Sequence, residues 1–135
     1  MAKSATHRHH RSGCPISIAL ELLGDAWSLL IVRDLMFKDR RTYKDFQMGG
    51  EGIASNVLAD RLRKLEDANI IEKRRDPEDA RRFLYRLSPR GIELAPVLVE
   101  LVTWPARHDQ SDAPPKRADR AAFLGKVRQQ WRSAS

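Results

Sequence analysis

Long apolar runs, a cysteine framework and a secretory signal are all missing from this sequence of 135 residues. A helix that spans a membrane needs about 18 or more consecutive apolar residues, and no run approaches that length, so we expect no membrane partner. The first dozen residues, MAKSATHRHHRS, lack the apolar stretch of a secretory signal. The single cysteine, Cys14, excludes an intrachain disulfide framework and is typical of a reducing compartment. We therefore expect a cytoplasmic protein.

Motifs for catalysis and for cofactor binding are also absent. The sequence has no HExxH pair, no glycine-rich phosphate loop, and no serine or cysteine nucleophile with a recognisable histidine and acid. His7, His9 and His10 have only Cys14 near them as a further type of ligand, so a phosphate-binding arm is favoured over a metal site. We expect neither enzyme activity nor a metal or other cofactor.

The net charge of +7 is unevenly distributed. Residues 1–14 carry three Lys or Arg and no acid, and residues 105–135 carry seven Lys or Arg and three acids. Of the totals of 25 basic and 18 acidic residues, 15 of each remain in residues 15–104. The central segment is neutral, so binding to nucleic acid has to rest on local clusters of charge. We expect a mobile basic arm at 1–13, a folded domain at 14–104, and a basic polar tail at 105–135 with a candidate helix at 117–131.

Hydrophobic periodicity predicts the elements of the first half of the domain. Apolar residues at helical spacing predict one helix from Pro15 to Gly24 and a second over about 26–36. A short strand is expected at Arg41–Thr42, followed by a brief helix that Thr42 caps and that the glycines of 49–52 close. A longer amphipathic helix covers 54–68. A short helix, a glycine-bearing turn and a longer helix make a helix-turn-helix.

The helix over 54–68 has an apolar stripe and a charged face. At about 100° per residue the stripe and the outer face lie on opposite sides, with Ser55 and Arg61 at the edges of the stripe. The stripe holds Ala54, Leu58, Leu62 and Leu65, and the outer face holds Asn56, Asp60, Arg63, Lys64 and Asp67. For an isolated helix, such a face is usually a solvated surface.

The helix-turn-helix context favours a second interpretation, in which this helix enters the major groove of DNA with its N-terminus first. Side chains that read bases are then expected in the first two turns, and we select Ser55, Asn56, Asp60 and Arg63. Asparagine pairs with adenine and arginine with guanine. Arg61 and Lys64 are placed for contacts to the DNA backbone. Asp60 is an anomaly, because phosphates repel a carboxylate unless it accepts from a cytosine amine or orients an arginine.

Two β-rich segments, at 70–75 and 82–88, predict a hairpin joined by a polar turn with a tip of about six residues. Five basic side chains flank the turn, namely Lys73, Arg74, Arg75, Arg81 and Arg82, with Arg86 lower down. Acids at the tip, Asp76, Glu78 and Asp79, offer internal counter-charges as the alternative to a binding role. Beside a helix-turn-helix we favour contact with phosphates or the minor groove, which makes binding fall steeply with salt.

A last helix is predicted from Ser88 and Pro89, suited to the N-cap and first helical position, to about Trp104. We expect Pro96 to kink it, because its ring displaces a backbone hydrogen bond. Apolar residues occupy more than one face, so one face packs on the domain and another needs a partner. The predicted fold is mainly α with a small β-hairpin: a winged helix-turn-helix that dimerises.

Several motifs, in order, carry a resemblance to a known family. They are Cys14–Pro15, ALELLGDAWSLLIVRDLM (19–36), RRTYKDFQ (40–47), GIASNVLADRLRKLEDANIIEKR (52–74), YRLSPRGIEL (85–94) and LVTW (101–104). The chain resembles the HxlR-type winged helix-turn-helix transcriptional regulators, relatives of the MarR group, over about 90 residues. It departs from their pattern at Ala26, where a lysine or arginine is usual, and at Asn69, where glycine is common.

The resemblance implies a homodimer on pseudo-palindromic double-stranded DNA. The interface is then built by the N-terminal segment and the helix at 89–104, with Ile16, Leu98, Leu101, Val102 and Trp104 as contact residues. Some relatives use a cysteine at the place of Cys14 to sense oxidants or electrophiles, and neighbouring Arg11 and the histidines favour its thiolate. The alternative is that Cys14 is a small buried packing residue.

We expect the protein to be a sequence-specific DNA-binding regulator, a repressor, whose DNA binding responds to an oxidant or a small-molecule effector. The alternative is a winged-helix adaptor that contacts proteins and has no specific DNA binding.

Overall fold

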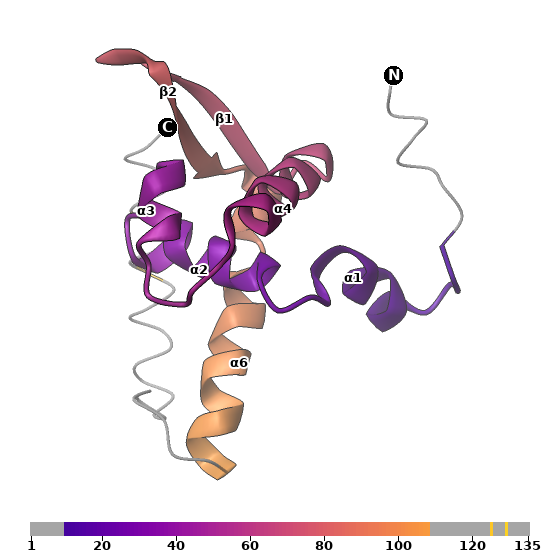
Figure 1. The fold of residues 1–135 in the computed structure, drawn as a ribbon. Helices are drawn as coiled ribbons and strands as arrows, with labels where there is room; N and C mark the ends of the chain where they lie inside the picture. The colour runs from indigo at the N-terminus through magenta and orange to yellow at the C-terminus, as the bar shows by residue number, and fades with distance from the viewer. Residues whose placement is uncertain (1–9, 109–124, 126–128, 130–135) are drawn as a thin grey trace.

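The computed structural model describes residues 10–108 together with Gly125 and Gln129 (Figure 1). The elements are α1 (Pro15–Leu23), α2 (Ser28–Phe37), α3 (Tyr43–Gln47), α4 (Ser55–Asp67), β1 (Ile71–Asp76), β2 (Asp79–Leu87), α5 (Pro89–Ile92) and α6 (Ala95–His108). This order of helices with one antiparallel hairpin is a winged helix-turn-helix, which confirms the predicted fold class. Residues 1–9 of the predicted arm, and the candidate helix at 117–131 apart from Gly125 and Gln129, lie outside the described residues.

The core forms where α2, α4, the base of the hairpin and the start of α6 meet. From α4 it takes Leu58, Leu62 and Leu65, each at most 2% exposed, which confirms this part of the predicted stripe. Ala54 differs, because it is the exposed N-cap residue of α4 and lies outside the core. The other buried apolar side chains of this cluster are Ile31, Val32, Leu35, Met36, Phe46, Ile70, Ile71, Tyr85, Leu87, Ala95 and Leu98.

The turn between α3 and α4 is fixed at both ends. Thr42 forms the expected cap of α3 as a capping box with Asp45, whose carboxylate accepts from the backbone N–H of Arg41 at 3.0 Å and of Thr42 at 3.1 Å. The predicted strand at Arg41–Thr42 is therefore wrong, because its N–H groups are used by the cap. Its remaining link to the sheet is the Arg41 carbonyl, which accepts from Tyr85 N at 2.8 Å. Gly50 and Gly52 follow with φ of 92° and 77°, as the expected change of direction requires.

The hairpin is longer and its tip is tighter than the sequence predicts. β1 and β2 pair from Ile71 with Leu87 up to Asp76 with Asp79, which leaves a tip of two residues, Pro77 and Glu78. The predicted tip of about six residues is wrong, because the Asp76 carboxylate accepts from the backbone N–H of Glu78 at 2.9 Å and closes the turn locally.

The predicted helix at 89–104 is two helices. α5 starts at Pro89 after the Ser88 cap, as expected, but it ends at Ile92, and α6 begins at Ala95. Gly91 of α5 lies so close to the residue before β1 that a Cβ there would be 2.2 Å from the carbonyl oxygen of Ile70. Pro96 does not kink a helix, because it lies in the first turn of α6, where a backbone N–H has no helical partner. Pro105 is accommodated inside α6, which runs on to His108.

α1 stands away from the rest of the domain (Figure 1). None of its residues is buried, although Ile16, Leu20 and Leu22 are large and apolar. No single helix of the described part of the chain is long and apolar enough to cross a membrane. The pair α1 and α2 passes such a test by length and composition alone, but the two helices bend by 79° at their junction, and α2 contributes to the core.

Candidate nucleic-acid interface

α4 and the hairpin lie toward one end of the domain, and α6 extends from the opposite end (Figure 1). On α4, Asn56, Arg63 and Lys64 are exposed, as their positions on the predicted outer face require. On the hairpin, the five predicted cations Lys73, Arg74, Arg75, Arg81 and Arg82 are all exposed. Because α4 packs against β1, these exposed cations belong to two neighbouring elements at one end of the domain, which we call the α4–wing surface.

The N-terminus of α4 is held by α3. Ser55 is exposed, but its hydroxyl accepts a hydrogen bond from Gln47 Nε2 at 2.6 Å, and its carbonyl accepts from the Tyr43 hydroxyl at 2.7 Å. The Ala54 cap offers no side-chain acceptor to the first N–H groups of α4. The first turn of α4, including Asn56, is consequently fixed in direction while its outer edge stays open.

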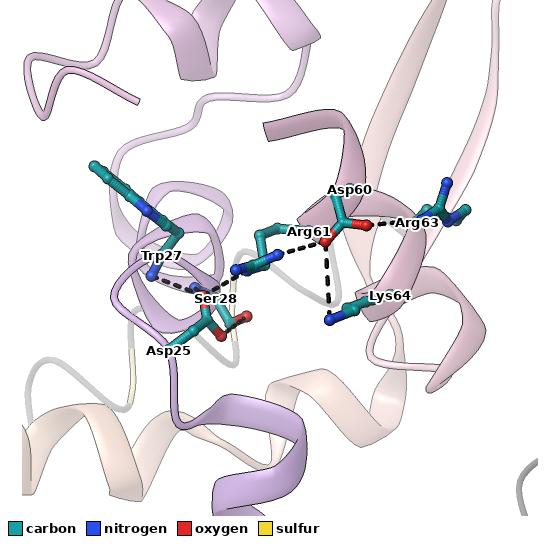
Figure 2. A network of polar contacts seen from close by, with 7 residues as sticks. All are labelled: Asp25, Trp27, Ser28, Asp60, Arg61, Arg63 and Lys64. Carbon is teal, nitrogen blue, oxygen red and sulfur yellow. Dashed lines mark hydrogen bonds and ion pairs between the residues drawn. The ribbon is translucent and has the colours of Figure 1, made fainter. Parts of the chain in front are cut away.

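Asp60 is the centre of a cluster of cations (Figure 2). Its Oδ1 accepts from Arg63 at 2.7 Å, its Oδ2 accepts from Arg61, and Lys64 Nζ lies 3.8 Å from the same Oδ2. The two carboxylate oxygens are therefore shared among three cations of its own helix. Of the two explanations for an acid on this face, the structure shows the second: Asp60 orients arginine side chains.

Arg61 lies differently from what the sequence suggested. Its guanidinium points to the corner between α1 and α2, where Nε donates to Asp25 Oδ2 at 2.8 Å (Figure 2). Its side chain is 23% exposed, and both of its acid partners, Asp25 and Asp60, belong to the protein. The predicted contact of Arg61 with the DNA backbone is revised, because the guanidinium is already engaged inside the domain.

Asp25 is the residue of this cluster that the sequence analysis missed. It caps α2, because it accepts from the backbone N–H groups of Trp27 and Ser28 at 2.9 and 3.0 Å and from the Ser28 hydroxyl at 2.5 Å. Burial opposes ionisation of Asp25, but the bonds from Ser28, Trp27 and Arg61 outweigh it and lower its pKa to about 2. The available signal was an aspartate just before a helix, a residue favoured as a cap.

The sequence left open whether the wing cations pair with acids at the tip or stay free for a partner, and the wing contains cations of both kinds. Arg82 is paired with the buried Asp76, and Arg81 with Asp79 at 3.2 Å, so part of the positive charge is balanced internally. Arg81 nevertheless remains 92% exposed, and within residues 10–108 no acid lies in ion-pair range of Arg74. Between Ile71 and Leu87 the hairpin holds six cations and four acids, and therefore keeps a positive charge.

An aromatic ring orders two further wing cations. Lys73 Nζ and the Arg75 guanidinium lie 4.7 and 4.8 Å from the centre of the Phe83 ring. Arg75 also donates to the Ala80 carbonyl at 2.5 Å, and Lys73 lies 3.8 Å from Glu66 of α4. These contacts give the wing cations defined positions next to α4.

The loop leading into α4 is tied to α2 by ion pairs. Asp34 is buried and accepts from Arg33 at 2.8 Å and from Arg40 at 2.9 Å. Arg33 also binds Glu51 at 2.8 Å, and although burial opposes its charge, Glu51 and Asp34 together raise its pKa. These pairs fix the glycine-rich loop against the core.

Cys14 is exposed, so the packing alternative for this residue is wrong. It is the N-cap residue of α1, and its backbone N–H is held by Ser12 Oγ at 3.2 Å. His10 and Arg11 were expected to act on the thiol, but the His10 ring lies 3.2 Å from Glu21 and the Arg11 guanidinium donates to the Ser17 hydroxyl at 3.3 and 3.4 Å. Within the described part of the chain, no group of three or more His, Cys, Asp or Glu is placed to hold a metal.

The residues expected at a dimer interface fall into two sets. Ile16 on α1 and Leu101 and Trp104 on α6 are exposed, and Val102 is half-buried. The prediction that Leu98 lies at the dimer interface is wrong, because its side chain is buried in the core of its own domain. The exposed side of α6 forms an apolar groove lined by Pro96, Val97, Glu100, Leu101, Trp104 and Arg107.

Comparison with known proteins agrees with this geometry. A family model described as an HxlR-like helix-turn-helix matches residues 22–113, well over half of the chain. The chain belongs to this family. The HxlR-like protein is 34% identical over 92 residues to the transcriptional regulator YodB of Bacillus subtilis, which covers 67% of this chain and 81% of YodB. It is 38% identical over 88 residues to the regulator sll1512 of Synechocystis, covering 65% of this chain and 64%, just under two thirds, of that relative.

Solved structures share the fold of the HxlR-like protein. PA1607, described as a candidate transcription factor, has a TM-score of 0.69 and is 33% identical in sequence. The match covers 77% of this chain and 71% of the PA1607 chain. Reduced YodB has a TM-score of 0.59 and 30% identity, covering 72% and 95%. Reduced HypR, a redox regulator, is alike in fold at a TM-score of 0.62 but only 20% identical, covering 70% and 92%. The family is one of helix-turn-helix transcriptional regulators and not of enzymes, as the sequence predicts.

Proposed function

We propose that this HxlR-like protein is a sequence-specific DNA-binding repressor that acts as a homodimer on pseudo-palindromic operators. The observation that carries the proposal is the α4–wing surface, where exposed cations of α4 and of the hairpin gather at one end of the domain. In a winged helix-turn-helix, α4 lies in the major groove with its N-terminus first, and the wing contacts the adjacent backbone. Asn56 and Arg63 then face base edges, while Lys64 and the wing cations face phosphates.

The apolar surfaces of α1 and α6 support a homodimer. α1 has nine residues and buries none of them, and a helix this short is marginal in water without packing. Exposed Ile16 and Leu20 on α1, with Leu101 and Trp104 on α6, are the surfaces for a second copy to cover. A two-fold dimer sets two recognition helices roughly 34 Å apart, one turn of DNA.

We further propose that DNA binding responds to oxidants or electrophiles through Cys14. The thiol is exposed at the start of α1, where an oxidant or electrophile can reach it. YodB, a relative in sequence and structure, has been solved in reduced, diamide-treated and quinone-bound forms. Because α1 belongs to the proposed interface, modification of Cys14 alters the dimer and thereby the spacing of the two recognition helices.

The test is a fluorescence anisotropy titration of the protein with DNA from upstream of its own gene, over a series of salt concentrations. We expect one preferred fragment, two protomers per site, and roughly 10³-fold or greater preference over unrelated DNA. Binding without any preferred fragment, disappearing near physiological salt, would contradict a specific repressor and favour the adaptor alternative.

A further inference from the structure

We infer that Asp60, Arg61 and Asp25 form a relay that positions Arg63 for reading DNA, so that sequence preference depends in part on a residue outside the helix-turn-helix. This inference rests on the proposed function, since it concerns how the proposed reading surface is set. Figure 2 shows the relay crossing from the corner between α1 and α2 to the outer face of α4.

The outer end of the relay is Arg63. Its side chain is 68% exposed, and a long exposed side chain loses rotamer freedom when it binds. Asp60 Oδ1 accepts from Arg63 NH2 at 2.7 Å and so restricts the guanidinium before DNA arrives. A guanidinium has five N–H donors, so one bond to Asp60 leaves enough donors for a bidentate contact with guanine.

The middle of the relay is the forked guanidinium of Arg61. Its Nε binds Asp25 at 2.8 Å while NH1 binds Asp60, so one rigid plane joins two carboxylates of different elements. A lysine ammonium carries the same charge but offers no such fork. Arg61 therefore fixes the carboxylate of Asp60, which in turn holds Arg63.

The inner end of the relay is anchored in the core. Asp25 is fixed by Ser28 and by the backbone N–H of Trp27 at the start of α2. Ile31 and Val32 of the same helix are buried in the core. Ordinary ion pairs within one helix are weak and hold a side chain loosely. The link to Asp25 distinguishes this cluster from such pairs. Through Arg61 and Asp60 it connects the side chain of Arg63 to a residue that is fixed at the start of α2.

The experiment measures base preference rather than affinity alone. Sites bound by the full-length protein are selected from a pool of randomised DNA, and affinities for selected and scrambled sites are then compared at one salt concentration. The variants are Asp60→Ala, Arg63→Ala, the double variant and Asp25→Asn, with Asp67→Ala as matched control. Asp67 is an exposed acid of the same helix, outside the relay.

We expect Asp60→Ala to reduce discrimination about 2- to 10-fold, the cost of ordering one freed side chain. Binding to scrambled DNA stays equal or rises, because a negative charge near the phosphates has been removed. Asp25→Asn gives a smaller loss at the same operator positions as Arg63→Ala. In the Arg63→Ala background, Asp60→Ala reduces discrimination no further. Asp67→Ala changes binding to all sequences alike.

The relay is overturned if Asp60→Ala still reduces discrimination in the Arg63→Ala background, because Asp60 then contacts a base itself. It is equally overturned if Asp60→Ala and Asp67→Ala act alike. Thermal unfolding of each variant shows that it is folded, and Asp60→Asn, which keeps an acceptor, replaces Asp60→Ala if that variant is not. A wild-type protein without a preferred sequence contradicts the proposed function, and the relay with it. Preference retained by Asp60→Ala overturns the relay alone.

Discussion

Arg82 donates from Nε and NH2, at 2.8 and 2.5 Å, to one carboxylate oxygen of Asp76, whose side chain is only 5% exposed. The backbone N–H of Glu78 donates to the other oxygen at 2.9 Å, and these bonds, from Glu78 first and then Arg82, lower the pKa of Asp76. The charge of Arg82 thus stabilises the tip of the wing, whereas Arg74 and the highly exposed Arg81 remain available for a partner.

Two arginines of the wing should differ in their effect: we expect Arg74 to contribute to DNA binding alone and Arg82 to contribute to folding stability as well. Arg74→Ala should weaken binding to every DNA sequence and reduce the slope of log affinity against log salt by about 0.9, the effect of one lost phosphate contact. Its melting temperature should not change. Arg82→Ala should lower the melting temperature as well, because the buried Asp76 loses its partner. Anisotropy titrations over a salt series and thermal unfolding check both variants, and equal melting temperatures would contradict the structural role of Arg82.

Asn56 provides a test of base reading. Asn56→Ala should cost about 1–3 kcal/mol at the preferred operator and nothing at scrambled DNA, because a lost base contact erodes preference alone. Lys64→Ala is the control, since a lost phosphate contact weakens both kinds of site together. Affinities of both variants for both DNAs are measured at one salt concentration. Equal losses at the two sites for Asn56→Ala would remove it from the reading residues.

Asp25 makes the stability depend on pH. Its pKa is about 2 in the folded protein against 3.8 as its ordinary value, so the unfolded chain binds the proton more tightly. The resulting stabilisation is fully present above about pH 4, amounts to roughly 1–2 kcal/mol, and is lost as pH falls towards 2. Urea unfolding of the wild type and of Asp25→Asn should differ most at pH 7, and the difference should narrow steadily as pH falls from about 4 towards 2. If the two free energies of unfolding still differ by the same amount at low pH, the difference does not come from the charge of Asp25.

The proposed dimer is tested by a charge placed on α6. Leu101→Asp should raise the dimer dissociation constant about 30-fold or more, since a central apolar contact is commonly worth at least 2 kcal/mol. Operator binding should weaken in parallel. Met48→Asp is the matched control, because Met48 is also large, apolar and exposed, but lies between α3 and α4. Light scattering after size-exclusion chromatography gives the mass, and monomers at every concentration of wild type would contradict the dimer.

Cys14 provides the test of the proposed response to oxidants. Cys14→Ser should bind the operator as the wild type does, and it should keep that affinity after peroxide or quinone treatment that weakens wild-type binding. Affinity before and after treatment is measured together with the mass of each protein, which reports modification. Identical responses of the two proteins would exclude Cys14 as the sensor.

Local sequence patterns were enough for the first four helices, for the presence of the hairpin and for the orientation of α4, but not for the strand expected at 41–42 or for the division of 89–104 into two helices. The spacing of Leu58, Leu62 and Leu65 defined its buried side, and Thr42 defined the start of α3. Residue types at helix ends and turns carry such information locally. The exposed cations of α4 and of the wing could also be identified locally, from their positions on the predicted helix and hairpin.

What could not be predicted depends on contacts between distant segments. Periodicity placed Arg61 at the edge of the apolar stripe, but it carries no information on which acid of another element lies opposite. The close approach of Gly91 in α5 to the Ile70 carbonyl is likewise a tertiary contact, between segments far apart in the sequence. Leu98 and Leu101 are both apolar and lie on one helix, and only the packed domain distinguishes the core residue from the surface one.

The bond between Arg61 and Asp25 bears on how regulators of this fold can be recombined. Recognition helices are natural units for grafting, since α4 is continuous from Ser55 to Asp67. A graft of this helix into a scaffold without an acid at the place of Asp25 would leave a half-buried guanidinium with Asp60 as its remaining acid partner. The transplantable module is therefore discontinuous, and a working chimera has to carry the corner before α2 together with the helix.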